Sequence, residues 1–218
     1  MMKLFDKNKT FRPKKKFEPG TIRYELHKKS KASLGASFKI QHSVKLPPGD
    51  DLNEWLAVHV VDFFNRINLI YGTLVDFCTP KTCPRMTAGS KFEYYWKDDH
   101  QYKQATSVST PLYVDLLMKW VESQINDESI FPPEVGRPFP KNFKAICANI
   151  FRRLTRVFCH VYIHHFEMIQ EIGAEAHINA CFKHFYYFTA EFKLVDEKEL
   201  RPLEDFINSV IKESPPAQ

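Results

Sequence analysis

Apolar residues recur at the spacing of an amphipathic α-helix over most of the chain beyond residue 50. The clearest case begins at Asp51, a favourable N-cap that follows the PPGDD break and has Glu54 three residues further on. A second helix is predicted to start at Ser109, because Pro111 falls where a first helical turn tolerates proline. The pattern predicts helices over residues 51–71, 109–126, 142–172, 174–192 and 197–212, with Gly173 ending the third of these.

The remaining segments are predicted to form shorter elements and loops. A short helix is expected over residues 22–34, and loops over residues 72–89 and 131–140. Residues 91–96 and 102–108 are rich in aromatic and β-branched side chains, so they are predicted to pair as a small hairpin. The short connections favour antiparallel helices, so the fold class is all-α (mainly α), a helical bundle with a small β-hairpin. We expect a basic flexible arm at 1–20, a single domain at 21–212 and a C-terminal tail at 213–218.

Composition places the chain among globular proteins. Its 218 residues include 19 Phe and only 7 Gly, enough to bury one substantial core. No apolar run approaches the roughly 18 residues of a membrane span, and the basic N-terminus lacks the apolar stretch of a secretory signal peptide. The five cysteines are an odd number, which argues against a disulfide framework. We therefore expect a monomer in a reducing compartment, cytoplasmic and also nuclear.

The positive charge is concentrated at the N-terminus. Residues 1–32 hold eleven Lys or Arg and three acidic residues, a balance of +8, so the rest of the chain carries −3 of the net +5. Such an arm is most commonly a solvated segment, and the alternative is contact with nucleic acid or an anionic surface.

Three histidines and a cysteine crowd the segment RVFCHVYIHHFEMI, residues 156–169. On an ideal helix His164 lies about 40° from His160, and His165 about 140° from it, so periodicity alone pairs His160 with His164. The apolar stripe of the same helix, however, passes through His165. A lone histidine in such a stripe is usually a hydrogen-bonded core residue rather than a metal ligand.

Two distant cysteines make a metal site worth considering. Cys78 and Cys83 form Cys-x4-Cys, and His160 with His165 forms His-x4-His, both within the ligand spacing of structural zinc sites. Five helical residues rise about 7.5 Å, a gap that two imidazoles can close by leaning together. Buried thiols beside a core histidine remain the alternative. Three further cysteines are expected to be small buried hydrophobic residues: Cys147, Cys159 and Cys181.

A metal held by four side chains would have a structural role, because four ligands saturate tetrahedral zinc. The competing hypothesis is a zinc-dependent hydrolase that uses His160, His164 and Glu167 and keeps one position open for water.

Long blocks of the sequence resemble a known family. They are NKTFRPKKKFEPGT, LPPGDDLNEWLAVHVVDFFNRINLIYGT, CTPKTCPRMTAGSKFEYYW, GRPFPKNF, FRRLTRVFCHVYIHHF and EAHINACFKHFYYF. From residue 9 to 211 the chain resembles the Mob family of kinase activators, most closely its type 3 subgroup. The resemblance implies a Mob-type helical bundle without catalytic activity, in which one structural Zn²⁺ is bound by Cys78, Cys83, His160 and His165.

The resemblance also implies partners. Mob proteins are noncatalytic adaptors and coactivators of Ser/Thr protein kinases of the nuclear Dbf2-related and large tumour suppressor type. They dock phosphorylated peptides of Ste20-like kinases, usually in Hippo-type signalling. The family's phosphopeptide site corresponds to Arg152, Arg153 and Arg156, which helical geometry places opposite the apolar stripe, where paired guanidinium donors suit a phosphate.

A second surface is acidic. Asp51, Trp55 and Asp62 fall within about 60° of one another on their helix, an arrangement suited to a basic partner helix with the indole as anchor. The alternative is a capped helix with one core tryptophan. In the family, the kinase's basic regulatory segment binds at the positions of Asp50, Glu54, Trp55 and Asp62.

The resemblance implies two phosphorylation sites near the N-terminus. They correspond to Thr10 and to Ser33, where the family has threonine. A phosphate at Thr10 would place about −2 among basic side chains and redirect the arm.

Overall fold

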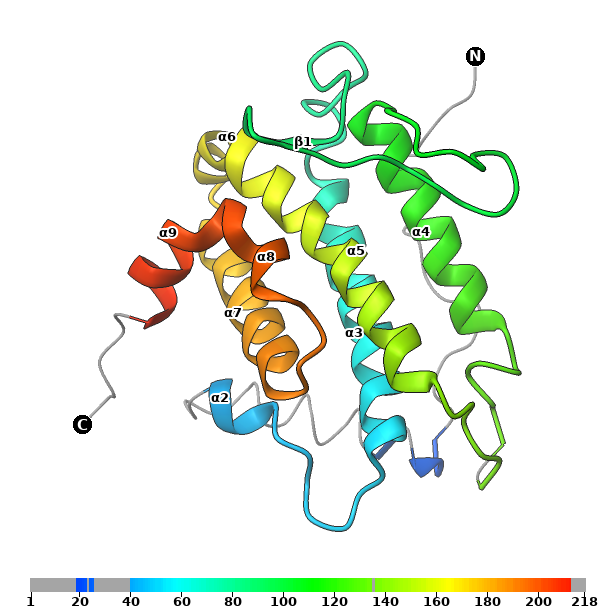
Figure 1. Ribbon diagram of the computed structural model, residues 1–218. Helices are drawn as coiled ribbons and strands as arrows, with labels where there is room; N and C mark the ends of the chain where they lie inside the picture. Colours follow the sequence, from blue (N-terminus) through cyan, green and yellow to red (C-terminus); the bar gives the residue numbers. More distant parts are fainter. Residues whose placement is uncertain (1–18, 23, 26–39, 135, 213–218) are drawn as a thin grey trace, which may run out of the picture.

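The structure is a computed structural model and describes residues 19–22, 24–25, 40–134 and 136–212. The short helix predicted at 22–34 falls mostly outside the described residues, and so do most of the arm and the whole tail at 213–218. The described elements confirm the mainly helical class (Figure 1). Their bounds are α2 Ile40–Ser43, α3 Leu52–Gly72, β1 Thr87–Ala88, β2 Phe92–Glu93, α4 Thr110–Asn126, α5 Phe143–His164, α6 Phe166–Glu171, α7 Glu175–Glu191, α8 Glu197–Leu200, η1 Arg201–Leu203, α9 Glu204–Phe206 and η2 Ile207–Lys212.

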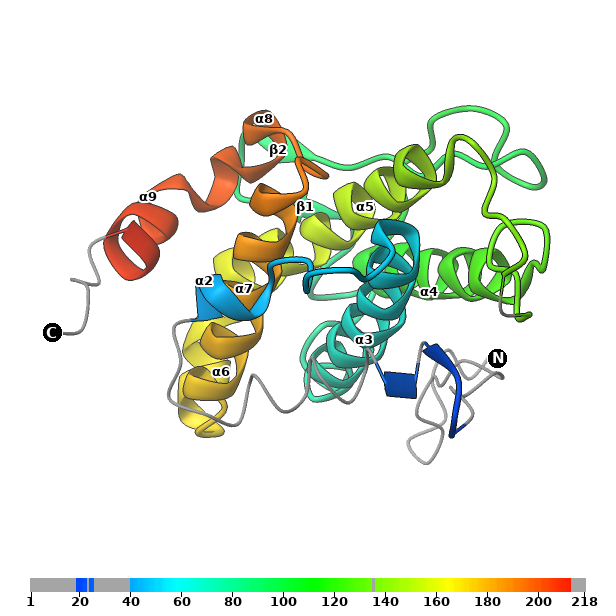
Figure 2. The ribbon, with the colours of Figure 1, turned by 90° about the horizontal axis from the view of Figure 1, so that it is seen from below.

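Helix α3 is the centre of the bundle. It begins as predicted at Asp51, whose carboxylate accepts hydrogen bonds from the backbone N–H groups of Asn53 and Glu54. Thirteen of its 21 residues are buried, so it is covered on most sides, as a central helix must be. It packs most extensively against α5, with α4 on one flank and α7 on the other (Figures 1 and 2).

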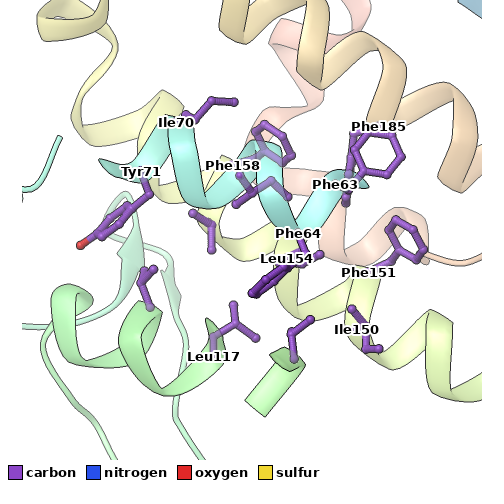
Figure 3. Close-up of a cluster of buried hydrophobic side chains, with 14 of the residues drawn as sticks. Phe63, Phe64, Ile70, Tyr71, Leu117, Ile150, Phe151, Leu154, Phe158 and Phe185 are labelled. Carbon is purple, nitrogen blue, oxygen red and sulfur yellow. The ribbon is translucent and has the colours of Figure 1, made fainter. Parts of the chain in front are cut away.

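Aromatic side chains fill the space between these helices. Figure 3 shows Phe63 of α3 beside Phe151 of α5 and Phe185 of α7. The ring centroids of Phe63 and Phe185 are 5.2 Å apart in an edge-to-face arrangement, and Phe158 lies 5.0 Å from Phe185. Edge-to-face pairs add a favourable quadrupole interaction to the burial of apolar area. This cluster fixes α5, which carries one candidate metal ligand and the three candidate phosphate-binding arginines, against α3.

The helix predicted over 142–172 is in fact two helices. Helix α5 ends at His164, and His165 adopts φ −132° and ψ 12° before α6 begins at Phe166. The prediction of one continuous helix is therefore wrong at a single residue, which leaves the helical conformation. Gly173 ends α6 with φ +68°, a left-handed conformation that glycine adopts without steric cost.

The predicted hairpin is wrong in its pairing. The two-stranded antiparallel sheet joins β1 to β2, with Thr87 opposite Glu93, so one strand comes from a segment predicted to be a loop. The expected partner segment contributes one isolated bridge, between Trp96 and Thr106.

The prediction of one last helix over residues 197–212 is also wrong in detail. The chain passes through α8, the 3₁₀ turn η1, α9 and the π-helical turn η2. Pro202 lies in η1, where it lacks the N–H that a continuous α-helix would need and its ring would collide with the preceding turn. Helix α8 packs across α5, which becomes important for the arginine side chains described below.

Candidate metal centre and partner surfaces

The loop after α3 turns both of its cysteines inward. The backbone N–H of Cys78 donates to the Leu74 carbonyl at 2.7 Å, and that of Cys83 donates to the Thr79 carbonyl at 2.8 Å. Between them, the Thr82 hydroxyl donates to the Phe77 carbonyl at 2.6 Å and holds the turn closed. Both thiols are buried, with the Cys78 residue 1% and the Cys83 residue 8% exposed.

Two histidines face these cysteines from the end of α5. His160 lies in the last turns of the helix, and its Nδ1 is 2.7 Å from the Thr87 carbonyl oxygen. A carbonyl only accepts, so Nδ1 carries the proton and Nε2 keeps its lone pair for a ligand. His165 reaches the same point because its backbone leaves the helix, rather than by the leaning of two helical side chains that the sequence predicted.

The four side chains converge on one point. The distance from Sγ to Nε2 is 3.5 Å both for Cys78 with His160 and for Cys83 with His165, and all four ligand atoms lie within 4.8 Å of one another. Zinc bonds of about 2.3 Å to sulfur and about 2.05 Å to nitrogen would put a sulfur and a nitrogen about 3.5 Å apart in a tetrahedron. The residues therefore fit a tetrahedral metal ion with four protein ligands.

Burial explains why this cluster suits a cation. Loss of water raises the pKa of the Cys78 thiol to about 12, and burial lowers the pKa of His160 to about 3. The imidazole is thus already neutral, as a ligand must be, while a buried thiolate requires a positive neighbour. The Tyr71 hydroxyl, 3.4 Å from the Cys78 sulfur, donates a hydrogen bond to it.

His164 lies outside the four-residue ligand group and has a separate contact. Its Nε2 accepts a hydrogen bond from the Gly89 N–H at 3.1 Å and lies 3.1 Å from the Thr87 hydroxyl. It therefore attaches the turn after β1 to the end of α5. Neither this contact nor the Tyr71 hydrogen bond could be predicted from the sequence, because the partners are distant in sequence or belong to the irregular cysteine loop.

The three arginines of α5 have different environments. Arg152 is exposed and donates to the side-chain oxygen of Asn149 at 2.8 Å. The guanidinium of Arg153 lies over two indole rings, 4.8 Å from the centroid of Trp96 and 4.5 Å from that of Trp120. This double cation–π contact holds a planar cation at the surface.

Arg156 is much less accessible than predicted. Its side chain is 18% exposed, its Nη1 donates to the Tyr113 hydroxyl at 2.9 Å, and its Nε lies 3.5 Å from a Glu199 carboxylate oxygen. Helical geometry places all three arginines opposite the apolar stripe, but Arg156 is largely covered by other parts of the protein. The sequence could not show this, because Glu199 reaches it from α8, a distant part of the chain.

The sequence comparisons agree with this architecture. Residues 31–203 match the Mob1/phocein family, which is most of the chain. The chain belongs to this family. It is 59% identical to human MOB kinase activator 3A and 59% identical to human MOB kinase activator 3B, each over 205 residues that cover 94% of this chain and 94–95% of the relative. It is also 55% identical to bovine MOB kinase activator 3C over 210 residues, 96% of this chain and 97% of that protein.

These similarities confirm the predicted resemblance to Mob type 3. At this identity over nearly the whole chain, the Mob-family assignment also confirms a regulatory protein rather than an enzyme, so the zinc hydrolase hypothesis is set aside. Within the described part of the chain, no helix of this Mob protein is both long and apolar enough to cross a bilayer.

The acidic surface of this Mob protein differs from its prediction at two residues, Trp55 and Asp62, which are buried. Trp55 is 1% exposed and its indole N–H donates to the Val44 carbonyl at 3.1 Å, so the interpretation of its ring as an anchor for a partner is wrong. Asp62 is 9% exposed and forms an ion pair with Arg66 at 2.8 Å. Of the predicted kinase-binding residues, Asp50 and Glu54 are partly exposed. The predicted phosphorylation sites Thr10 and Ser33 lie outside the described residues.

Proposed function

We propose that the four-residue centre binds one Zn²⁺ with a structural role. Two thiolates with two imidazoles are a donor set that favours zinc, and four protein ligands leave no position for a reacting water. The ion would tie the cysteine loop to the end of α5. Metal analysis should give a zinc-to-protein ratio near one that falls on Cys83→Ser, whereas Cys147→Ala, a change at a buried cysteine of α5 outside the centre, should leave it unchanged. An equal loss from both variants would contradict the assignment.

We further propose that the protein is a noncatalytic adaptor that binds Ser/Thr protein kinases and modulates their activity in Hippo-type signalling. Its relatives are named kinase activators, which supports a kinase partner. The observation that carries the proposal is the immobilised guanidinium of Arg153 beside the exposed Arg152. Arginine offers paired donors to the doubly charged phosphate of phosphothreonine, and Arg153 presents them from a fixed position. We therefore assign this surface, with Arg156 at its edge, to phosphopeptides of Ste20-like kinases.

Calorimetry with a phosphothreonine peptide from a Ste20-like kinase tests this assignment. Arg152→Ala and Arg153→Ala should each weaken binding about tenfold or more, because a charge-assisted hydrogen bond contributes about 1.5–3 kcal/mol. The matched control is Arg85→Ala, which removes an arginine that is 64% exposed and pairs with Glu93. Equal affinity of the wild type and both α5 variants would refute phosphate docking at this surface.

A second contact is proposed for the acidic start of α3. Asp50 and Glu54 would attract the basic regulatory segment of a nuclear Dbf2-related or large tumour suppressor kinase, while Trp55 supports the helix from inside. Charge reversal to Asp50→Lys and Glu54→Lys should reduce co-precipitation of such a kinase. A cytoplasmic and also nuclear location remains a prediction, which fluorescence imaging of the tagged protein tests.

A further inference from the structure

Arg156 already has an anionic partner inside the protein. Its Nε lies 3.5 Å from a carboxylate oxygen of Glu199, and the two side chains are only 18% and 22% exposed. Nearby charge interacts strongly at such a site, because little water screens it. A phosphate that approaches Arg156 therefore meets a guanidinium that Glu199 has partly neutralised.

The position of Glu199 is fixed by the fold. Helix α8 packs across α5, and the Cys159 thiol of α5 lies 3.8 Å from the backbone carbonyl of Glu199, to which it donates. The carboxylate is thus held beside Arg156 by the packing of the C-terminal segment.

Arg156 does not depend on Glu199 for its position. Its Nη1 donates to the Tyr113 hydroxyl at 2.9 Å, and its guanidinium carbon lies 5.2 Å from the ring centroid of Tyr94. These two tyrosines would keep the side chain in place if the carboxylate lost its charge. The carboxylate therefore changes the charge of the site more than its geometry.

We propose that Glu199 is a specificity-determining residue of the arginine surface, acting as an internal carboxylate with which an incoming anion competes for Arg156. This inference rests on the phosphopeptide function proposed above. A phosphate carries about −2 and three acceptor oxygens, so it can compete with one carboxylate. A Glu or Asp side chain of a peptide carries only −1, so it gains little by replacing Glu199. The surface thereby distinguishes phosphothreonine from acidic residues.

The test compares three peptides of one sequence, with phosphothreonine, glutamate or threonine at the central position, by calorimetry in about 0.1 M salt. Glu199→Gln should bind the phosphothreonine peptide at least about fivefold more tightly than the wild type, because fivefold is the effect of two unit charges about 4 Å apart in bulk water and this site is less screened. Glu199→Gln should also bind the glutamate peptide measurably. The ratio of its affinities for the phosphothreonine and glutamate peptides should therefore be smaller than in the wild type. The gain should shrink in about 1 M salt, where the screening length is roughly 3 Å.

The matched control is Glu197→Gln, the same charge change on the same helix at an exposed residue. It should alter the affinity less than twofold, because the Glu197 side chain is exposed and solvent and salt screen its charge. A second set of measurements in an Arg156→Gln background should show most of the Glu199→Gln gain lost. Glu199→Met, which keeps the chain length without polarity, replaces Glu199→Gln if the latter lowers the melting temperature.

The outcomes separate this inference from the proposed function. If the wild type binds the phosphothreonine peptide and Glu199→Gln binds it equally or more weakly, the role of Glu199 is overturned while phosphate docking stands. An equal gain from Glu197→Gln also overturns it, because net charge then explains the result. If neither the wild type nor Glu199→Gln binds the peptide, both proposals fall. Tighter binding by Glu199→Gln alone, lost in high salt, supports both.

Discussion

The hydrogen bond from Tyr71 to the Cys78 sulfur provides a sharp test of the metal centre. The hydroxyl lies 3.4 Å from Sγ, and the ring is 1% exposed, so water does not replace the donor when it is removed. Tyr71→Phe deletes this donor and keeps the ring that packs in the core. The change should therefore weaken metal binding while the fold persists.

The magnitude follows from the charge of the acceptor. With a metal bound, Cys78 is a thiolate, and a hydrogen bond to a charged group contributes about 1.5–3 kcal/mol. That free energy corresponds to a decrease of about 10- to 100-fold in metal affinity, the range found when residues that support metal ligands are replaced.

Competition for zinc with a chromophoric chelator measures this affinity. Tyr162→Phe is a matched control, because the Tyr162 hydroxyl is also inside the protein and donates to the Asn179 side chain at 2.9 Å, not to a metal ligand. Both variants should unfold cooperatively, and only Tyr71→Phe should lose zinc to the chelator. Unchanged zinc affinity in a folded Tyr71→Phe protein would refute the hydrogen-bond argument.

Three further predictions concern stability, each measured by urea unfolding. Trp55→Ala should lower the free energy of unfolding by about 3–5 kcal/mol, the usual effect of truncating a buried tryptophan. A decrease below about 1 kcal/mol would contradict the place of Trp55 in the core. Burial, then His59 and Arg66, lowers the folded-state pKa of His184 to about 2, so its stabilising contribution is present above the unfolded pKa of about 6.5 and falls as pH drops. Between pH 7 and pH 5 the free energy of unfolding of the wild type should fall by about 2 kcal/mol more than that of His184→Gln. Equal decreases in the two proteins would contradict the effect of burial on the His184 pKa. Gly173→Ala should lower the free energy of unfolding by about 1–2 kcal/mol, because φ at this residue is +68°. Gly72→Ala, at the end of α3 with open space around the added Cβ, should leave the stability unchanged or increase it.

Local patterns in the sequence predicted the helices well where the physics is local. The N-cap at Asp51 and the glycine at 173 fix helix ends through backbone conformation and adjacent hydrogen bonds, which neighbouring residues determine. Cysteine and histidine spacing likewise identified the four residues that the structure brings together, although the spacing alone left buried thiols as an alternative.

The errors have tertiary causes. His165 looks helical in every local respect, yet it leaves the helix and meets Cys83, whose place is set by a distant loop. Trp55 lies near acidic residues on a helical wheel, which suggested an exposed face, but α2 and the following turn supply the Val44 carbonyl that covers it. Pro202 is different, because its effect on the last helix is local and a stricter reading of the sequence would have found it.

The metal centre and the arginine surface lie at two ends of one short segment. Thr87 begins β1, and its carbonyl accepts the hydrogen bond of His160. Nine residues later, Trp96 pairs with Thr106, and its ring supports the Arg153 guanidinium. A metal ion that holds His160 therefore also fixes the start of the segment that ends beneath Arg153. The proposed structural metal would in this way affect the proposed phosphopeptide binding, because it would restrain the backbone on which the cation–π contact depends.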